Sequence, residues 1–275
     1  MKIVIGSLAG HTLPAAWQAQ FPEVEFVPAR TVAEQVAAVR DADAYLGMIS
    51  REAFLAAGSR LRWVHAGSAG IERLAAIPEL VESDVVVTNT RGAHAPCIAD
   101  HAFAMLLALT RRLPDLLADQ RQHVWRRPGV VSGMRELTGA TLVIVGLGNI
   151  GRAIARRAVA FDMRLLGVDV RPGEPPAGVE VVWGLERLDE ALGQADVVAV
   201  ATPFTPQTRH LLDARRIGLI KPGAYLLVVS RGGIVEEPPL IAALREGRLS
   251  GAGLDVQEHE PLPADDPLWE APNLI

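Results

Sequence analysis

The chain has 275 residues, of which 49% are hydrophobic and 21% charged, an ordinary balance for a soluble globular protein. Its net charge of −5 argues against a nucleic acid or an anionic membrane surface as the main partner. The single cysteine excludes an intramolecular disulfide framework and a zinc site built from several cysteines, and the seven histidines show no metalloprotease spacing. No metal site is therefore expected.

The N-terminal residues predict the start of a folded domain. Met1 leads directly into the strand-like run KIVIG, without the charged, apolar and cleavage regions of a secretion signal. No uninterrupted apolar stretch approaches the roughly 20 residues that span a bilayer. We therefore expect a cytoplasmic protein with no membrane partner.

Short β-type runs alternate with helical patterns along the first third of the chain. The strands expected there are KIVIG, VEFV, AYLGM, LRWVHA and VVVTN. Between them lie helix-like segments such as TVAEQVAAVR, in which Val32, Val36 and Val39 recur on one helix face. This alternation predicts a parallel sheet with helices on both faces, in a smaller domain over residues 1–95.

An apolar segment over residues 97–125 connects this domain to the rest of the chain. It predicts a long helix that is interrupted near Pro114 and followed by a polar helix, with Cys97 as a small buried residue. From residue 141 a second series of strands follows, TLVIVG, MRLLGVD, VEVVWG, ADVVAVA, AYLLVVS and GAGLDV. Six strands with helices between them predict an α/β, doubly wound Rossmann domain over residues 96–275.

The sharpest local motif is VIVGLGNIGRAIARR, in which Gly146, Gly148 and Gly151 form GxGxxG between an apolar strand and an amphipathic helix. The first glycine permits a tight turn, the second lets the backbone approach a pyrophosphate, and the third allows close packing of the helix. The N-terminus of that helix supplies N–H donors for phosphates. The motif and its flanking elements together predict a dinucleotide site.

The identity of the dinucleotide depends on Asp169, which closes the next strand 23 positions after Gly146 (169 − 146). An acid at this place binds both ribose hydroxyls of NAD and repels the 2′-phosphate of NADP. Arg171, two residues later, is a side chain that NADP would use instead. The spacing favours NAD and leaves NADP as the alternative.

The fifth strand of the second domain, AYLLVVS, is followed by Arg231 and two glycines. Ligands bind outside the carboxyl ends of such strands, and the next strand ends on the same edge. Asp255, Glu258 and Glu260 are therefore expected to lie near Arg231. The fork of donors on an arginine suits a carboxylate and an adjacent carbonyl oxygen. The alternative is an Arg–Glu bridge that caps the sheet.

Several ordered segments together resemble the D-isomer-specific 2-hydroxyacid dehydrogenases. They are LTGATLVIVGLGNIGRAIARRA, TPFTPQTRHLL, KPGAYLLVVSRGGIVEEPPLIAALREGRLSGAGLDVQEHEPLP and PLWEAPNLI, and the likeness continues upstream in LRWVHAGSAGIERL and NTRGAHAPCIADHAFAMLLALTRRLP. The resemblance implies a flavodoxin-like substrate domain with the substrate in a cleft beside the Rossmann domain. It also implies NAD-dependent reduction of a small 2-keto acid to the D-2-hydroxy acid; glyoxylate, hydroxypyruvate and bulkier keto acids all fit.

The same resemblance implies roles for individual residues. Arg231 matches the arginine that grips the carboxylate and carbonyl of the substrate, and Glu260 matches the glutamate that pairs with the catalytic histidine. A carboxylate beside that histidine raises its pKa, so that it can protonate the carbonyl oxygen. Three residues that begin a predicted helix match the backbone donors for the substrate carboxylate, with an ordinary turn as the alternative: Ser68, Ala69 and Gly70.

The cofactor set that follows from the motif and the resemblance is Gly146, Gly148, Asn149, Ile150, Gly151, Asp169, Thr202, Pro203, Ser230 and Asp255. In that set, Asp255 matches an aspartate that reaches the nicotinamide carboxamide; its alternative role is to cap the strand end. Members of the family are usually dimers built through the nucleotide domain, so a homodimer is expected. The surfaces nominated for it are the helix 98–110 and Trp125, although burial within one subunit also explains them.

The family's histidine stands in a Thr-Pro-His-like segment after the stretch equivalent to PNLI, and the sequence ends at Ile275. His259 adjoins Glu260 but occupies a non-catalytic position of the motif. Three other histidines are expected to be structural: His94, His101 and His123. The chain is therefore expected to bind NADH and a keto-acid mimic but to turn over very slowly. The alternative function is a non-catalytic NAD(H)-binding sensor or scaffold of the same fold.

Overall fold

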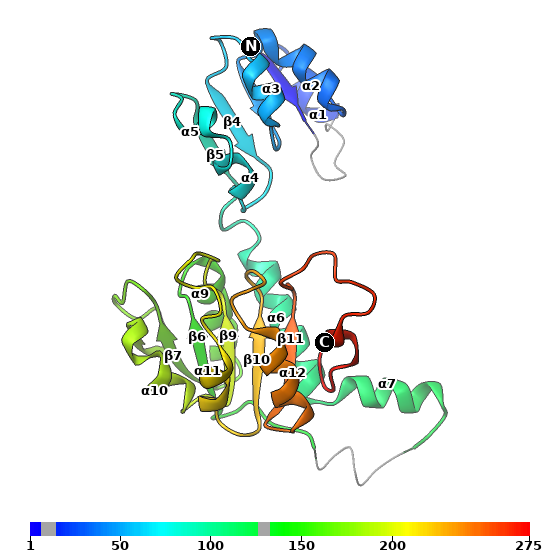
Figure 1. Ribbon diagram of the computed structural model, residues 1–275, viewed down its shortest axis with the longest axis vertical. Helices are drawn as coiled ribbons and strands as arrows, with labels where there is room; N and C mark the ends of the chain where they lie inside the picture. Colours follow the sequence, from blue (N-terminus) through cyan, green and yellow to red (C-terminus); the bar gives the residue numbers. More distant parts are fainter. Residues whose placement is uncertain (7–14, 126–132) are drawn as a thin grey trace. The chain divides into compact units, whose positions relative to one another are not determined.

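The structure is a computed structural model, and it describes residues 1–6, 15–125 and 133–275. These residues form two units, Met1–His94 and Ala95–Ile275, and each unit has its own parallel β-sheet (Figure 1). The second unit begins at the first residue of helix α6 (Ala95–Thr110).

The first unit contains five parallel strands in the order β2-β1-β3-β4-β5, which is the flavodoxin-like order. The strands are β1 (Lys2–Ile5), β2 (Glu25–Pro28), β3 (Ala44–Leu46), β4 (Trp63–Ala66) and β5 (Val86–Asn89). Each overlaps a run that the sequence predicts as a strand, and β2 extends one residue beyond VEFV, to Pro28. The helical segments are α1 (Ala15–Gln20), α2 (Val32–Ala38), η1 (Val39–Asp41), α3 (Arg51–Ala56), α4 (Glu72–Ala75) and α5 (Pro78–Val81).

The second unit contains six parallel strands in the order β11-β10-β9-β6-β7-β8. They are β6 (Thr141–Val145), β7 (Arg164–Val168), β8 (Val179–Trp183), β9 (Val197–Val200), β10 (Ala224–Val228) and β11 (Leu249–Leu254). The first three strands extend from β6 in one direction and the last three in the other, which is the doubly wound Rossmann order. The strand order therefore reverses between β6 and β9.

Helices cover both faces of this second sheet. One core packs the strands against α6 and α9 (Asn149–Val159), and the other packs them against α10 (Leu188–Leu192), α11 (Ala214–Leu219) and α12 (Glu237–Arg245). Strand β6 contributes to both: Leu142 and Ile144 enter the first core, and Val143 and Val145 enter the second. The three central strands, β6, β9 and β10, are fully buried, and almost all of their residues are therefore apolar.

The connecting segment differs in detail from the sequence prediction. Helix α6 ends at Thr110, and α7 (Leu113–Arg121) begins after Arg112 adopts a left-handed conformation, so the break precedes Pro114. The prediction that Cys97 is buried is wrong, because α6 turns Ala95, Ala99 and Ala102 toward its core and leaves Cys97 exposed. Within the described ranges, the structure contains no helix long and apolar enough to cross a membrane.

The final residues extend the second sheet. Leu274 pairs in parallel with Ala252 of β11, and the N–H of Leu254 donates to the carbonyl of Ile275 at 2.8 Å. The short 3-10 segment η3 (Pro267–Glu270) precedes this pairing. Residues 273–275 therefore run beside β11 in the direction of its carboxyl end. The carboxyl ends of the parallel strands together form what we call the carboxyl edge of the sheet, where Arg231 and Asp255 lie.

Candidate cofactor and substrate site

The glycine motif forms the turn between β6 and α9. Gly146 has a φ of +95°, and a Cβ atom there would lie 2.8 Å from the backbone nitrogen of Thr202. A Cβ on Gly151 would lie 2.0 Å from the carbonyl oxygen of Gly146, so the packing of the turn requires both glycines. Gly148, which precedes the first residue of α9, is exposed, and a Cβ there would meet nothing within 4 Å. The middle glycine thus leaves open space at the N-terminus of an 11-residue helix, where an anionic group is stabilised.

The carboxylate of Asp169 is held beside this turn. Its Oδ2 accepts the N–H of Leu147 at 2.8 Å, and its Oδ1 accepts the N–H of Arg171 at 3.0 Å. A carboxylate oxygen has more than one acceptor direction, so each oxygen retains capacity for a ligand hydroxyl. The side chain of Asp169 is half-buried, whereas Arg171 is exposed. The sequence prediction placed Asp169 near the glycines, and the structure joins them directly.

Three further predicted cofactor residues follow the neighbouring strands β9 and β10. Thr202 and Ser230 are buried, and Pro203 is exposed. The hydroxyl of Ser230 is buried without a hydrogen-bond partner among the described residues. The carbonyl of Pro203 accepts the hydroxyl of Thr208 at 2.7 Å, which fixes the turn after β9. The Ser230 hydroxyl can still donate and accept a hydrogen bond at the carboxyl end of β10, and this suits a polar ligand.

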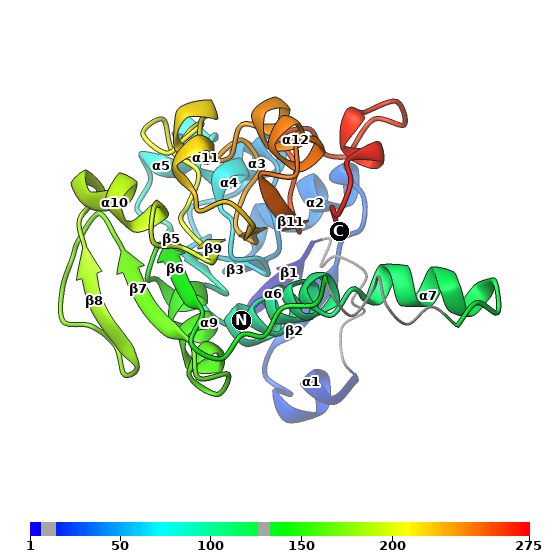
Figure 2. The ribbon, with the colours of Figure 1, turned by 90° about the horizontal axis from the view of Figure 1, so that it is seen from below.

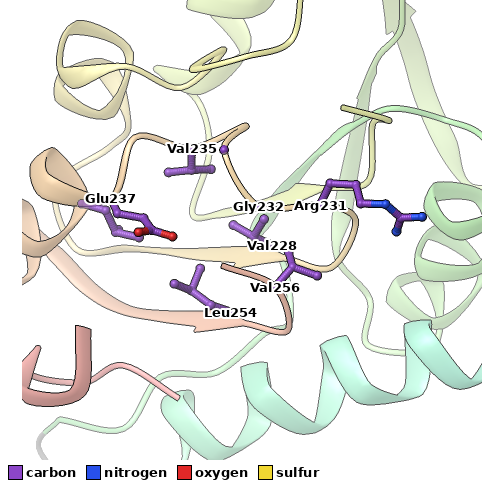
Figure 3. A pocket seen from close by; sticks show the side chains of 9 residues that line it. Val228, Arg231, Gly232, Val235, Glu237, Leu254 and Val256 are labelled. Carbon is purple, nitrogen blue, oxygen red and sulfur yellow. The ribbon is translucent and has the colours of Figure 1, made fainter. Parts of the chain in front are cut away.

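Arg231 follows β10 on the same edge and is exposed. Its Nη1 donates to the carbonyl of Ser230 at 2.7 Å. Figure 3 shows the guanidinium extending away from the small apolar pocket behind it, while the carboxylate of Glu237 lies at that pocket. The pocket has a volume of about 10 Å³, which holds one water at most, so it does not accommodate a substrate.

The loop after β10 that contains Arg231, Gly232 and Gly233, called the arginine loop below, packs against the loop that follows β11. A Cβ on Gly232 would lie 1.8 Å from the carbonyl oxygen of Gln257, so the two backbones meet directly. This contact confirms that the segment carrying Glu258 lies beside the arginine loop. The carboxylate of Glu258 is 3.4 Å from Nε2 of His210 and 3.7 Å from Nη2 of Arg209.

A second contact holds the loop that follows β11 against helix α12. Oε1 of Glu237, at the start of α12, accepts the backbone N–H of Glu258 at 2.7 Å. Burial is the main reason that the pKa of Glu237 is raised above its ordinary value, and the nearby carboxylate of Glu258 adds to the effect. Sequence reasoning missed this contact because nothing in RGGIVEEPPL indicates which of its two glutamates turns inward.

The other predicted residues of the carboxyl edge come from the β11 loop. Glu260 is exposed, and its Oε1 accepts the N–H of Gln257 at 3.1 Å. Asp255 is also exposed; its N–H donates to the carbonyl of Val228 at 2.9 Å, and its Oδ1 lies 3.4 Å from Nε2 of His101. Sequence reasoning treated His101 as structural, since the rotation of α6 about its axis was unknown.

The predicted substrate donors lie in the first unit, after β4. Ser68 donates its hydroxyl to the carbonyl of Gly70 at 2.8 Å, and Asn89 donates to the carbonyl of Ala69 at 2.8 Å. These contacts hold an exposed turn, so the expectation that the three residues begin a helix is wrong. Helix α4 begins at Glu72 and has four residues. Any binding by the turn would therefore use its own N–H groups rather than a helix dipole.

The described ranges contain no group of three or more histidine, cysteine, aspartate or glutamate side chains arranged to hold a metal ion. The residues offer hydrogen-bond donors and acceptors at the carboxyl ends of β6, β7 and β9, and a positive charge at Arg231.

Comparison with known proteins gives consistent matches. Residues 103–275 match the family described as D-isomer specific 2-hydroxyacid dehydrogenase, NAD binding domain. The chain is 36% identical over 264 residues to a glyoxylate reductase of Thermococcus gammatolerans, which covers 93% of this chain and 77% of that protein. It is also similar to two solved structures.

The first is a D-isomer specific 2-hydroxyacid dehydrogenase family protein from Aeromonas salmonicida, with a TM-score of 0.87, 34% identity, and coverage of 100% of this chain and 86% of that one. The second is a D-isomer specific 2-hydroxyacid dehydrogenase from Xanthobacter autotrophicus in complex with NADPH and MES, with a TM-score of 0.78 and 27% identity. That match covers 99% of this chain and 86% of the other.

Proposed function

Because the chain belongs to the D-isomer specific 2-hydroxyacid dehydrogenase family, a family of oxidoreductases with a Rossmann NAD-binding domain, we propose that it reduces a small 2-keto acid to the D-2-hydroxy acid with NADH. The observation that carries the proposal is the shared edge of the second sheet. There the glycine turn, Asp169 and the Arg231 loop follow the carboxyl ends of β6, β7 and β10, three strands of one parallel sheet in which β9 separates β10 from β6.

The residues of this edge fit a nicotinamide dinucleotide. The open side of Gly148 leaves space at the start of α9 for the pyrophosphate. Asp169 retains acceptor capacity for ribose hydroxyls, and the carboxylate charge disfavours a 2′-phosphate, which supports NADH over NADPH. Asp255 and the buried hydroxyl of Ser230 supply polar atoms toward the nicotinamide end. When bound, this cofactor supplies the hydride.

The chain's own residues then bind and orient the keto acid. The planar guanidinium of Arg231 donates two parallel hydrogen bonds to the substrate's carboxylate and its neighbouring keto oxygen. Backbone N–H groups of residues 68–70 remain our predicted second contact for the carboxylate. By the resemblance, Glu260 would hold a histidine imidazolium, and that imidazolium would donate its proton to the keto oxygen as the alcohol forms.

Our assignment of that histidine rests on the resemblance alone.

The alternative is a sensor or scaffold that binds NAD(H) without turnover. The two functions are separated by giving the protein NADH together with glyoxylate, hydroxypyruvate or phenylpyruvate and following the absorbance of NADH. An enzyme consumes NADH in proportion to the D-2-hydroxy acid formed. A sensor binds NADH and leaves its amount unchanged.

We propose further that the protein is a homodimer, with α7 and Trp125 in the interface. Helix α7 extends from the body of its unit (Figure 2) and exposes Leu113 and Leu117, and Val124, just beyond its end, is exposed as well. Trp125 is 84% exposed, and apolar surface of this kind is typical of a protein–protein contact. Much of helix 98–110 is instead buried against its own sheet, which favours α7 over α6 as the contact.

Light scattering at micromolar concentration tests this assembly. The expected mass is about twice the 29.4 kDa of one chain. Replacing Trp125 and Leu117 by serine is expected to shift the mass toward that of one chain. A single-chain mass for the unaltered protein would contradict the dimer.

A further inference from the structure

Helix α6 and strand β11 pack in a regular register that ends at the carboxyl edge. A Cβ on Gly251 would lie 3.0 Å from the side chain of Leu109, and a Cβ on Gly253 would lie 2.9 Å from Cβ of Met105. Each step of four residues along the helix advances about 6 Å, and each step of two along the strand about 6.6 Å. The next step places His101 opposite Asp255.

The side chains meet as this register requires. Nε2 of His101 lies 3.4 Å from Oδ1 of Asp255, with side chains that are 52% and 41% exposed. The backbone of Asp255 is fixed by its hydrogen bond to Val228 of β10. Glycines at the two preceding inward positions of β11 let α6 approach closely enough for this contact.

The neighbouring acid does not compete for the histidine. Asp100 precedes His101 on α6, and its carboxylate pairs with Nε of Arg157 on α9 at 2.5 Å. The pairing of Asp100 with Arg157 lowers the pKa of Asp100, which keeps that carboxylate ionised and engaged. His101 is thereby directed to Asp255 and to the open edge beyond it.

We propose that His101 is a positioning residue for the nicotinamide end of the cofactor. Its Nε2–H donates to Oδ1 of Asp255 and holds the carboxylate so that Oδ2 accepts the N–H of the carboxamide. Either the imidazolium or the neutral tautomer with hydrogen on Nε2 supplies this donor. The inference rests on the proposed cofactor and deepens it, since it adds a residue that the sequence motifs do not assign.

Loss of the His101 donor should weaken binding of the nicotinamide half of the cofactor and leave binding of the adenosine half unchanged. Without the donor, the exposed carboxylate of Asp255 turns among several orientations, and binding of the carboxamide must restrict it again. We expect His101→Leu to weaken NADH binding by about three- to fivefold, the upper part of the range for a partly exposed charged contact. ADP-ribose has the same adenosine and pyrophosphate but no nicotinamide, so its affinity should change by less than about twofold.

The test uses the full 275-residue chain and two titrations, NADH by nicotinamide fluorescence and ADP-ribose by calorimetry. His101→Leu removes the donor, whereas His101→Gln offers an amide N–H at a similar reach and is expected to restore most of the affinity for NADH. In an Asp255→Ala background, His101→Leu should cause no further loss, because its effect acts through that carboxylate. Binding of ADP-ribose by each variant reports that the Rossmann unit is folded.

Several results would overturn the inference. Unchanged NADH affinity in His101→Leu, or equal losses for NADH and ADP-ribose, would leave His101 as a structural residue. A full additional loss in the Asp255→Ala background would show that His101 acts independently of Asp255. Failure of the unaltered chain to bind NADH would instead overturn the proposed cofactor, and this inference with it.

Discussion

Replacing Arg231 by lysine is expected to weaken the binding of oxamate, a mimic of a 2-keto acid, to the NADH-loaded protein by about 10- to 100-fold. Lysine keeps the positive charge but cannot supply two parallel donors to the carboxylate and the neighbouring carbonyl. Loss of one hydrogen bond to a charged group costs about 1.5–3 kcal/mol, and each 1.4 kcal/mol is about tenfold in affinity. Calorimetric titration with oxamate at saturating NADH measures the change.

The matched control is Arg245→Lys, because Arg245 is an exposed arginine in the last turn of α12, away from the carboxyl edge. It should leave oxamate affinity within about twofold, and both variants should bind NADH as the unaltered protein does. If Arg231→Lys bound oxamate normally, Arg231 would be a structural cap of the sheet, and the substrate would have to be held elsewhere.

Replacing Asp169 by alanine is expected to lower NADH affinity by about 10- to 100-fold and to leave NADPH affinity unchanged or higher. The carboxylate provides charged acceptors for ribose hydroxyls, each worth about 1.5–3 kcal/mol, and its charge opposes the 2′-phosphate. Fluorescence titrations with both cofactors measure the ratio. The unaltered protein should bind NADH more tightly than NADPH.

Two variants separate charge from loop structure at this position. Asp169→Asn retains one acceptor for the N–H of Leu147 or Arg171, so the glycine turn should persist while the repulsion of a 2′-phosphate is lost. Asp265 is an exposed aspartate just before η3, and Asp265→Ala should change the affinity for neither NADH nor NADPH. If the unaltered protein bound NADPH more tightly than NADH, this account would be contradicted, and Arg171 would be the residue expected to bind the 2′-phosphate.

The architecture was predictable because its signals are local. Apolar runs with turn residues between them predicted all five strands of the first sheet and all six of the second, and GxGxxG located the turn at Gly146. The proximity of the Gly232 and Gln257 segments also followed from sequence, because parallel strands joined by one crossover end on the same edge.

The residues that sequence reasoning missed depend on how elements pack. His101 reaches Asp255 only because glycines in β11 admit α6 closely and the helix has one particular rotation about its axis. Cys97 lies on the exposed side of that helix for the same reason. A string of small apolar residues such as those of α6 carries a weak amphipathic signal, so its buried face could not be identified in advance.

The turn at Ser68–Gly70 shows a different limit. Its sequence resembles a helix start, but the hydroxyl of Ser68 and the amide of Asn89 bind the carbonyls of the turn itself. Asn89 is 20 residues away from Ala69 along the chain and reaches it only because β4 and β5 are neighbours. A contact between strands therefore decided a local conformation.

The most direct test of the central claim is transfer of the hydride itself. The protein is incubated in molar excess with NADH deuterated at the transferring C4 position and with hydroxypyruvate or phenylpyruvate, so that even a slow single turnover is visible. The account predicts a 2-hydroxy acid that carries deuterium at C2 and has the D configuration, as read by mass spectrometry and chiral chromatography. Protein that binds the deuterated NADH but yields no deuterated hydroxy acid, or yields the L-isomer, would contradict it.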